Sequence, residues 1–267
     1  MADEAGALLT PKIEGRGEFG RERGNAPSLP MPRPWTFPSR GLAVFHGYGE
    51  TARLSHYFLP RLLMEGKRVL FLDGANSADP RLLARLARER GVAFEQFSQQ
   101  IQIARAFTCF QLTELIARVP RFLADFPAQV LVVTALPDLY FDGDVRDWDA
   151  RVAFERALGD LRRYGSGDVS PVASGEWQVA SEDKVGTAVG TPPLQLAVAV
   201  FSSSPDFAPA PSRKRFFQQT CAAATEVWKF TPGEGGKTKL LCIRKLSAVR
   251  FQAKPSAIST QQKQTVF

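Results

Sequence analysis

Gly47-Tyr48-Gly49-Glu50-Thr51-Ala52-Arg53-Leu54 is the stretch that decides the fold of this 267-residue chain. The apolar run Leu42 to Phe45 precedes it and predicts a buried strand, the glycines predict a tight turn, and an amphipathic helix pattern starts at Thr51. Strand, glycine turn and helix in this order allow backbone N–H groups and a helix N-terminus to bind phosphate. The stretch therefore predicts the scaffold of a nucleotide-binding loop.

The rest of the chain repeats this alternation of short apolar runs and segments with helical periodicity. The apolar runs predict strands at 42–45, 68–72, 100–104, 130–133, 194–201, 226–230 and 239–244. The helical patterns cover 51–64, a segment that begins at 79–80, 109–126, 144–164 and 213–225. This alternation predicts an α/β fold with a mostly parallel central sheet and helices on both faces, and the last two strands predict a C-terminal β-hairpin.

One domain, residues 40–254, is expected to hold the core, with Trp148 inside it. Residues 1–39 are rich in glycine, proline and mixed charge and predict a disordered N-terminal arm. The polar residues 255–267 predict a disordered tail. Residues 165–193 are poor in apolar side chains and too long for an ordinary loop, which predicts a flexible insertion.

The composition excludes several classes of protein. No apolar run approaches the ~20 residues that a membrane span needs, and the N-terminus lacks a signal-peptide pattern, so no membrane partner is expected. The three cysteines are far apart and only two histidines accompany them, which argues against a disulfide framework and against a zinc site. These features favour a cytoplasmic protein.

Several motifs carry a family resemblance. Ile101-Gln102-Ile103-Ala104-Arg105-Ala106-Phe107 is followed by Gln111-Leu112-Thr113-Glu114-Leu115-Ile116, and the strand at 130–133 precedes the pair Leu139-Tyr140. An earlier strand, Arg68-Val69-Leu70-Phe71-Leu72-Asp73, agrees in position. Over this part of the chain the sequence resembles the RadA-type branch of the RecA superfamily. The resemblance implies a RecA-like P-loop core.

The chain departs from that family at the nucleotide site. The Walker A Gly-Lys-Thr aligns with Gly49-Glu50-Thr51, or with Ala52-Arg53-Leu54 in an alternative register that starts at Gly47. Neither register keeps the lysine, and the Walker B aspartate aligns with Thr134. A degenerate nucleotide-binding site is therefore expected at Gly47, Gly49, Glu50, Thr51, Arg53 and Thr134.

These departures bear on catalysis, because phosphoryl transfer relies on positioned cations and a bound metal ion. No catalytic residue and no metal site are expected, and Asp73 is the only remaining candidate for a general base. No cofactor is expected either, with weak binding of ATP and Mg²⁺ as the alternative.

A basic segment lies near the C-terminus. Residues 210–254 carry ten Lys and Arg against two Glu, a net charge of +8, whereas residues 1–209 sum to about −2. Within it, Arg213, Lys214 and Arg215 precede two phenylalanines, 216 and 217. Clustered cations beside aromatic rings suit phosphate neutralisation and base stacking, so these three cations are predicted to bind DNA. In the alternative, both phenylalanines are core-facing residues of a helix and do not contact DNA.

The sequence thus predicts a catalytically degenerate RecA- or RadA-like protein that acts as a DNA-binding or recombinase-binding accessory in DNA recombination or repair. Its expected partners are single- or double-stranded DNA without base specificity, a recombinase, and further copies of the chain in a homo-oligomer. Two alternatives stay open. One is an active DNA-dependent ATPase that uses a non-standard cation such as Arg53, and the other is a protein-interaction scaffold that binds no nucleic acid.

Overall fold

The computed structural model describes residues 37–38, 40–47, 50–167, 196–203, 211–232 and 238–245. The expected N-terminal arm, apart from residues 37 and 38, and the expected tail lie outside these ranges. Most of the expected insertion at 165–193 also lies outside them, and its first residues end a helix.

A seven-stranded sheet forms the centre of the described structure, in the order β3-β2-β4-β5-β1-β6-β7. The strands are β1 (Gly41–Gly47), β2 (Val69–Asp73), β3 (Ile101–Arg105), β4 (Val130–Thr134), β5 (Ala197–Ser203), β6 (Glu226–Pro232) and β7 (Thr238–Lys245). Strands β1 to β6 run parallel, and β7 pairs antiparallel with β6. The predicted α/β class and mostly parallel sheet are confirmed. The turn of the expected hairpin falls in residues 233–237, outside the described ranges.

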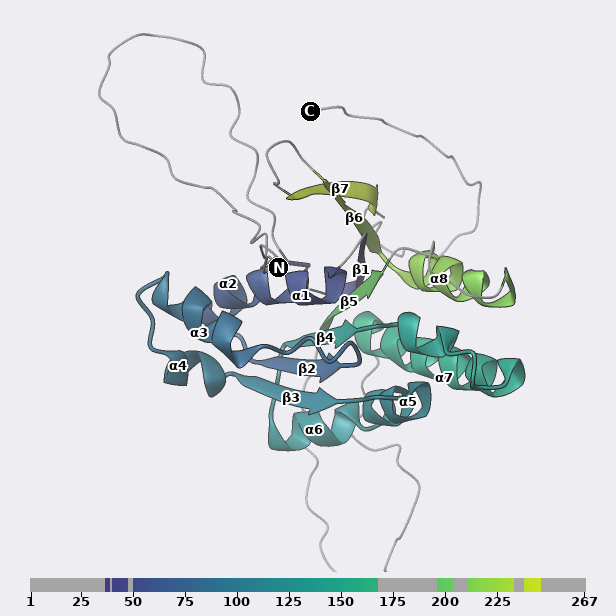
Figure 1. Ribbon diagram of the computed structural model, residues 1–267. Coiled ribbons are helices and arrows are strands. Elements are labelled where there is room, and N and C mark those ends of the chain that lie inside the picture. The colour runs from purple at the N-terminus through teal and green to yellow at the C-terminus, as the bar shows by residue number, and fades with distance from the viewer. Residues whose placement is uncertain are drawn as a thin grey trace, which may run out of the picture.

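Helices cover both faces of this sheet (Figure 1). One layer consists of α1 (Thr51–Leu54), the 3-10 helix η1 (Ser55–Tyr57), α2 (Leu59–Met64), α3 (Pro80–Arg88) and α4 (Phe94–Ser98). The other consists of α5 (Cys109–Ala117), α6 (Val119–Asp125), the 3-10 helix η2 (Asp138–Phe141), α7 (Asp147–Ser166) and α8 (Pro211–Ala223). None of the helices in the described ranges is both long enough and apolar enough to cross a membrane.

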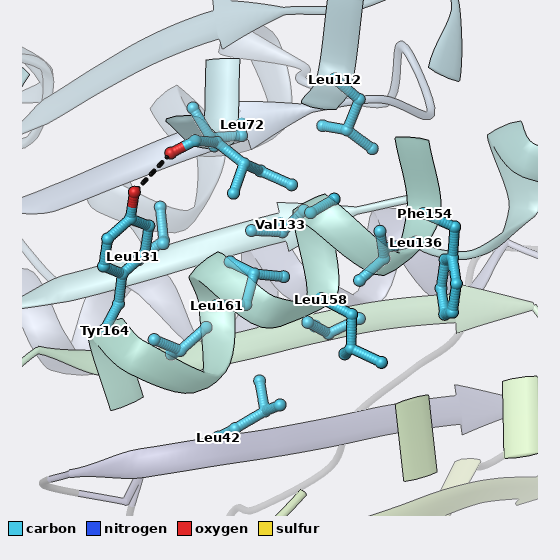
Figure 2. Packing of buried hydrophobic residues seen from close by; sticks show 14 of the residues in the cluster. Leu42, Leu72, Leu112, Leu131, Val133, Leu136, Phe154, Leu158, Leu161 and Tyr164 are labelled. Atoms are coloured by element: carbon cyan, nitrogen blue, oxygen red, sulfur yellow. Dashed lines mark hydrogen bonds between the residues drawn. The ribbon is translucent and has the colours of Figure 1, made fainter. Parts of the chain in front are cut away.

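Apolar side chains on both faces of the sheet hold the layers together. Every residue of β1, β2 and β4 is buried, as expected of parallel strands covered on both sides. On one face Leu161 of α7 packs over Leu131 and Val133 of β4 (Figure 2). The hydroxyl of Tyr164 donates a hydrogen bond of 2.9 Å to the carbonyl of Ile116, which ties α7 to α5.

Two of the expected helices are interrupted. The pattern at 51–64 divides into α1, η1 and α2, because Ser55 Oγ bonds to the carbonyl of Ala52 at 2.6 Å and Pro60 stands in the first turn of α2. The pattern at 109–126 divides into α5 and α6 at Pro120, in the first turn of α6. Helix α4 and the 3-10 helix η2 have no counterpart among the expected elements.

The register of the sheet brings the C-terminal residues of neighbouring parallel strands side by side at one edge. Gly47 of β1 lies opposite Ser203 of β5, and Asp73 of β2 lies opposite Thr134 of β4. All four residues end their strands. Ligands of open parallel sheets bind outside the carboxyl ends of the strands, so this edge is where a site is sought.

Candidate functional site

A cavity of about 790 Å³ lies at the carboxyl edge of the sheet, where the sequence predicts the nucleotide site. It is bounded by the start of α1, by the loop from β2 to α3, and by the residues that follow β4 and end β5. Its charged lining residues are Glu50, Asp79 and Asp138 together with Arg53 and Arg81. The cavity thus presents three carboxylates and two guanidinium groups.

The predicted phosphate loop begins as the glycine pattern requires, although Gly49 lies outside the described residues. At Gly47 a Cβ would come within 2.8 Å of the Cβ of Phe230, so the close approach of β6 excludes a side chain. Thr51 begins α1 and is fully buried, and its Oγ1 has no hydrogen-bond partner within the described ranges. Because α1 is only four residues long, it presents a single turn to the cavity.

The negative charge of Glu50 is compensated by a cation from the same loop. Arg53 Nη1 lies 3.2 Å from Glu50 Oε2, and Arg53 Nη2 lies 3.4 Å from Asp79 Oδ2. The guanidinium group therefore bridges the start of α1 and the start of α3. These side chains are substantially exposed, so each pair contributes only about 0–1 kcal/mol to stability. The bridge matters because it engages the one cation of the predicted loop.

The N-terminus of α3 is capped from within the chain. Asp79 Oδ1 accepts hydrogen bonds from the N–H groups of Arg81 at 2.9 Å and Leu82 at 3.1 Å. The bond from Leu82 is the main reason that the pKa of Asp79 lies below its usual range. An N-cap carboxylate already satisfies the donors that would otherwise bind an anion here.

Asp73, the candidate general base, has a structural role. Its carboxylate is fully buried and accepts hydrogen bonds from the Ser77 N–H at 2.9 Å, the Ala78 N–H at 2.8 Å and the Thr134 hydroxyl at 3.0 Å. Arg105 Nε lies 3.7 Å from the second oxygen. Both oxygens are engaged and the side chain is buried, so the geometry favours a structural role over that of a general base, for which Asp73 is the one remaining candidate.

Thr134 belongs to the same hydrogen-bond network as Asp73. Its hydroxyl donates to Asp73 and accepts a hydrogen bond of 3.1 Å from the Ala75 N–H. The side chain is fully buried. A hydroxyl therefore ties the end of β4 to the loop after β2, at the position where the family resemblance places a metal-binding carboxylate.

His56 connects the start of α3 at Asp79 with the carbonyl of Arg53 in α1, a role that the sequence does not predict. Its Nε2 lies 3.1 Å from the Asp79 N–H, which can only donate, so Nε2 is an acceptor and the ring proton lies on Nδ1. Nδ1 then donates to the carbonyl of Arg53 at 3.0 Å. Burial lowers the pKa of His56 below its ordinary value, which favours this neutral form. No sequence signal marks this contact, because 23 residues separate its partners.

Asp138 lines the cavity from the opposite side. Its carboxylate accepts hydrogen bonds from Ser202 Oγ at 3.1 Å and from the Ser203 N–H at 2.9 Å. Burial raises the pKa of this carboxyl group, and the two hydrogen bonds oppose that shift. Asp138 follows Thr134 by four residues, and its carboxylate is engaged by Ser202 and Ser203 of the protein.

The predicted DNA-binding residues separate into two kinds. Arg213 is buried, and its guanidinium group donates to the carbonyls of Asp142 and Val145 and forms an ion pair with Asp147. It therefore holds α8 against the segment before α7, and the prediction that Arg213 contacts DNA is corrected. Lys214 and Arg215 are exposed.

Other cations of the basic segment also have partners in the protein. The guanidinium group of Arg244 donates to backbone carbonyls at the end of α8, including that of Cys221 at 2.5 Å. Lys245 Nζ lies 3.1 Å from Glu226 Oε1. Phe216 and Phe217 are buried, as the alternative expected. The net charge of the segment thus overstates the number of cations that are available to a ligand.

No group of three or more His, Cys, Asp or Glu within the described ranges is arranged to hold a metal ion. No protein-family model and no curated protein sequence matches the chain.

Proposed function

We propose that this protein is a catalytically inactive relative of RecA and RadA that acts as an accessory in DNA recombination or repair by binding DNA or a recombinase. One observation carries the inactivity. The polar groups at the carboxyl edge of the sheet, where a P-loop enzyme binds Mg²⁺-nucleotide, are engaged by the protein itself: Thr134 bonds to Asp73, and Arg53 pairs with Asp79.

The charges of the cavity support the same conclusion. Three carboxylates against two guanidinium groups give a formal balance of −1, and Arg53 is already engaged by Glu50 and Asp79. A triphosphate needs cations that neutralise its charge as the transition state forms. A site of this composition repels the ligand and lacks the group that would hold its metal ion.

The accessory role is supported by the fold class and by exposed cations. A mostly parallel α/β sheet with Gly47 at the end of a buried strand is compatible with the RecA-like core that the sequence resembles. Lys214, Arg215 and Lys239 are exposed and can neutralise phosphates. A protein-interaction scaffold without nucleic acid is the competing role, and DNA-binding measurements separate the two.

The inactivity is tested by measuring ATP turnover of the purified protein with and without single-stranded DNA. We expect no turnover above a protein-free control in either condition. Enzymes commonly turn over at about 1–10³ s⁻¹, so an activity near 1 s⁻¹ is easily detected. Turnover that disappears in Arg53→Ala, but persists in the exposed control Arg88→Ala, would establish the alternative in which Arg53 replaces the lysine.

A further inference from the structure

An exposed tryptophan lies in the first turn of α7. Trp148, expected in the core, is 69% exposed, and Val152 one turn later is 48% exposed. The guanidinium carbon of Arg151 lies 5.9 Å from the centre of the Trp148 indole ring, a distance at which a cation and an aromatic face attract each other. The ring is therefore held at the surface with an adjacent cation.

The first turn of α8 lies beside this tryptophan. Asp147, the neighbour of Trp148, accepts hydrogen bonds from Ser212 Oγ at 3.2 Å and from Arg213 Nε at 2.8 Å. The pKa of Asp147 is lowered chiefly by Arg213, and the positive charge of Arg215 contributes. Buried Arg213 thus fixes the start of α8 against the start of α7. Its exposed neighbour Arg215 is close enough to Asp147, the residue before Trp148, to act on it electrostatically.

Of the charged side chains around Trp148, two cations, Lys214 and Arg215, are not taken up by the ion pairs of α7. The acidic residues of the first turns of α7 are paired, Asp149 with Arg146 at 2.7 Å and Glu155 with Arg151 at 2.8 Å. Within the described ranges, neither Lys214 nor Arg215 has an acidic partner at ion-pair distance.

Acidic residues of the preceding loop limit this positive surface on one side. Asp142 and Asp144 are both exposed in this loop, so negative charge borders the cations of α8 on the side of the loop before α7.

We propose that single-stranded DNA binds across the first turns of α7 and α8, with a base stacked on Trp148 and phosphates bound by Lys214 and Arg215. An aromatic face next to cations is the arrangement that binds unpaired bases and their backbone together. A duplex keeps its bases stacked inside, so it can use the cations but not the ring. This inference rests on the proposed DNA-binding function and narrows it to one strand form and one surface.

The test is fluorescence anisotropy of the full chain with a labelled 20-nucleotide oligo(dT) and with a duplex of the same length, over a series of salt concentrations. Trp148→Ala is expected to weaken binding of oligo(dT) by about 5- to 100-fold, because the fold-change in affinity from losing one base stacked on an aromatic ring falls in this range. Trp148→Phe keeps a stacking face and is expected to retain most of the affinity. Duplex binding is expected to be unchanged in both variants.

The cations are tested by changing Lys214 and Arg215 together to alanine. The slope of log affinity against log salt for oligo(dT) is expected to flatten by about 1.4, since each phosphate contact with a single strand contributes about 0.7. The matched control changes two exposed arginines, Arg88 of α3 and Arg121 of α6, and is expected to leave the slope unchanged. Circular dichroism melting of each variant verifies that it is folded.

Each outcome decides between the two proposals. If oligo(dT) binds but all variants keep the wild-type affinity and slope, DNA is held elsewhere, and this inference fails while the proposed function stands. If Trp148→Ala weakens duplex and oligo(dT) equally, the stacking role is wrong. If the wild-type protein binds neither form at 20–50 mM salt, the DNA-binding function and this inference fail together, and the surface is left to a protein partner.

Discussion

At the scale of single residues, the hydroxyl of Thr134 has a structural role in the candidate site. Thr134 stands where the family resemblance places a metal-binding aspartate, and its hydroxyl donates to the buried carboxylate of Asp73. Asp73 in turn accepts backbone N–H groups of the loop that forms one wall of the cavity. A donor at position 134 is therefore required by the present fold, and an acidic residue there would face a second buried carboxylate.

This arrangement predicts that an aspartate at position 134 destabilises the protein. Thr134→Asp places two carboxylates about 3 Å apart in a site with no solvent access, and we expect the free energy of unfolding to fall by at least about 3 kcal/mol. Thr134→Ser keeps the donor and serves as the control, with a much smaller loss. Urea denaturation followed by circular dichroism measures both, and an Asp variant as stable as the wild type would contradict the assigned network.

At the scale of secondary-structure elements, one arginine docks α8. The guanidinium group of Arg213 reaches backbone carbonyls on both sides of the loop between η2 and α7, and it pairs with Asp147 at the start of α7. The carbonyl of Asp142 also accepts a hydrogen bond of 3.3 Å from the Val145 N–H. Removing the guanidinium group therefore leaves Asp142 with that one donor and takes a charged donor away from the carbonyls of Tyr140 and Val145.

We therefore expect Arg213→Ala to lower the free energy of unfolding by about 2–4 kcal/mol, because it removes a buried guanidinium group and the charged hydrogen bonds that this group gives to backbone carbonyls. Arg215→Ala, two residues away and exposed, removes the same charge and is expected to change stability by less than about 0.5 kcal/mol. Thermal and urea melts of both variants measure the difference. Equal stability of the two variants would show that Arg213 does not hold α8 in place.

Strand positions could be predicted from the sequence because buried parallel strands are short, continuous apolar runs. The expected strand at 68–72 differs from β2 by one residue at each end, and the expected strand at 130–133 differs from β4 by one residue at its C-terminal end. Helix continuity could not be predicted as well, since the periodicity of 51–64 runs through the turn at Ser55 and Pro60. Local hydrogen bonds and proline determine where these helices are interrupted, whereas the apolar pattern determines which helix faces are buried.

The candidate site was located by its glycine turn, but its internal bonding was not foreseen. Glu50 and Arg53 line the cavity at the expected edge. The pairings of Asp73 with Thr134 and of His56 with Asp79 join residues that are 61 and 23 positions apart, and a single sequence does not encode such contacts visibly. Trp148 was misplaced because helical spacing shows that residues share a face, but not which face meets the core.

At the scale of the whole molecule, the two layers of helices differ in what they bring to the carboxyl edge. The layer of α1 to α4 closes the cavity through His56, Arg53 and Asp79, whereas the layer with α7 and α8 presents Trp148, Lys214 and Arg215. The cavity is stabilised by neutral or internally paired groups. The free energy of unfolding should therefore depend on pH in the range where a buried neutral group such as His56 takes up a proton on unfolding.

The two histidines of the chain set the pH range of this response. His46 packs against Phe217 with ring centres 5.1 Å apart, and burial, with a further contribution from Lys229, lowers its pKa to about 4. Burial likewise lowers the pKa of His56. The unfolded chain, with an ordinary histidine pKa near 6.5, then binds more protons than the folded protein, so stability falls as the pH drops below about 6.5.

We expect the urea midpoint of the wild type to decrease steadily between pH 6.5 and about 4, the range between the unfolded and folded pKa values of His46. His46→Met fills the same apolar site without a titrating group, so its midpoint should decline less over this range, whatever its stability at pH 7. The difference between the two curves isolates His46 from Asp138, whose raised pKa acts in the opposite direction. Parallel curves would mean that His46 binds protons equally in the folded and unfolded chains, and that its burial against Phe217 is not maintained in solution.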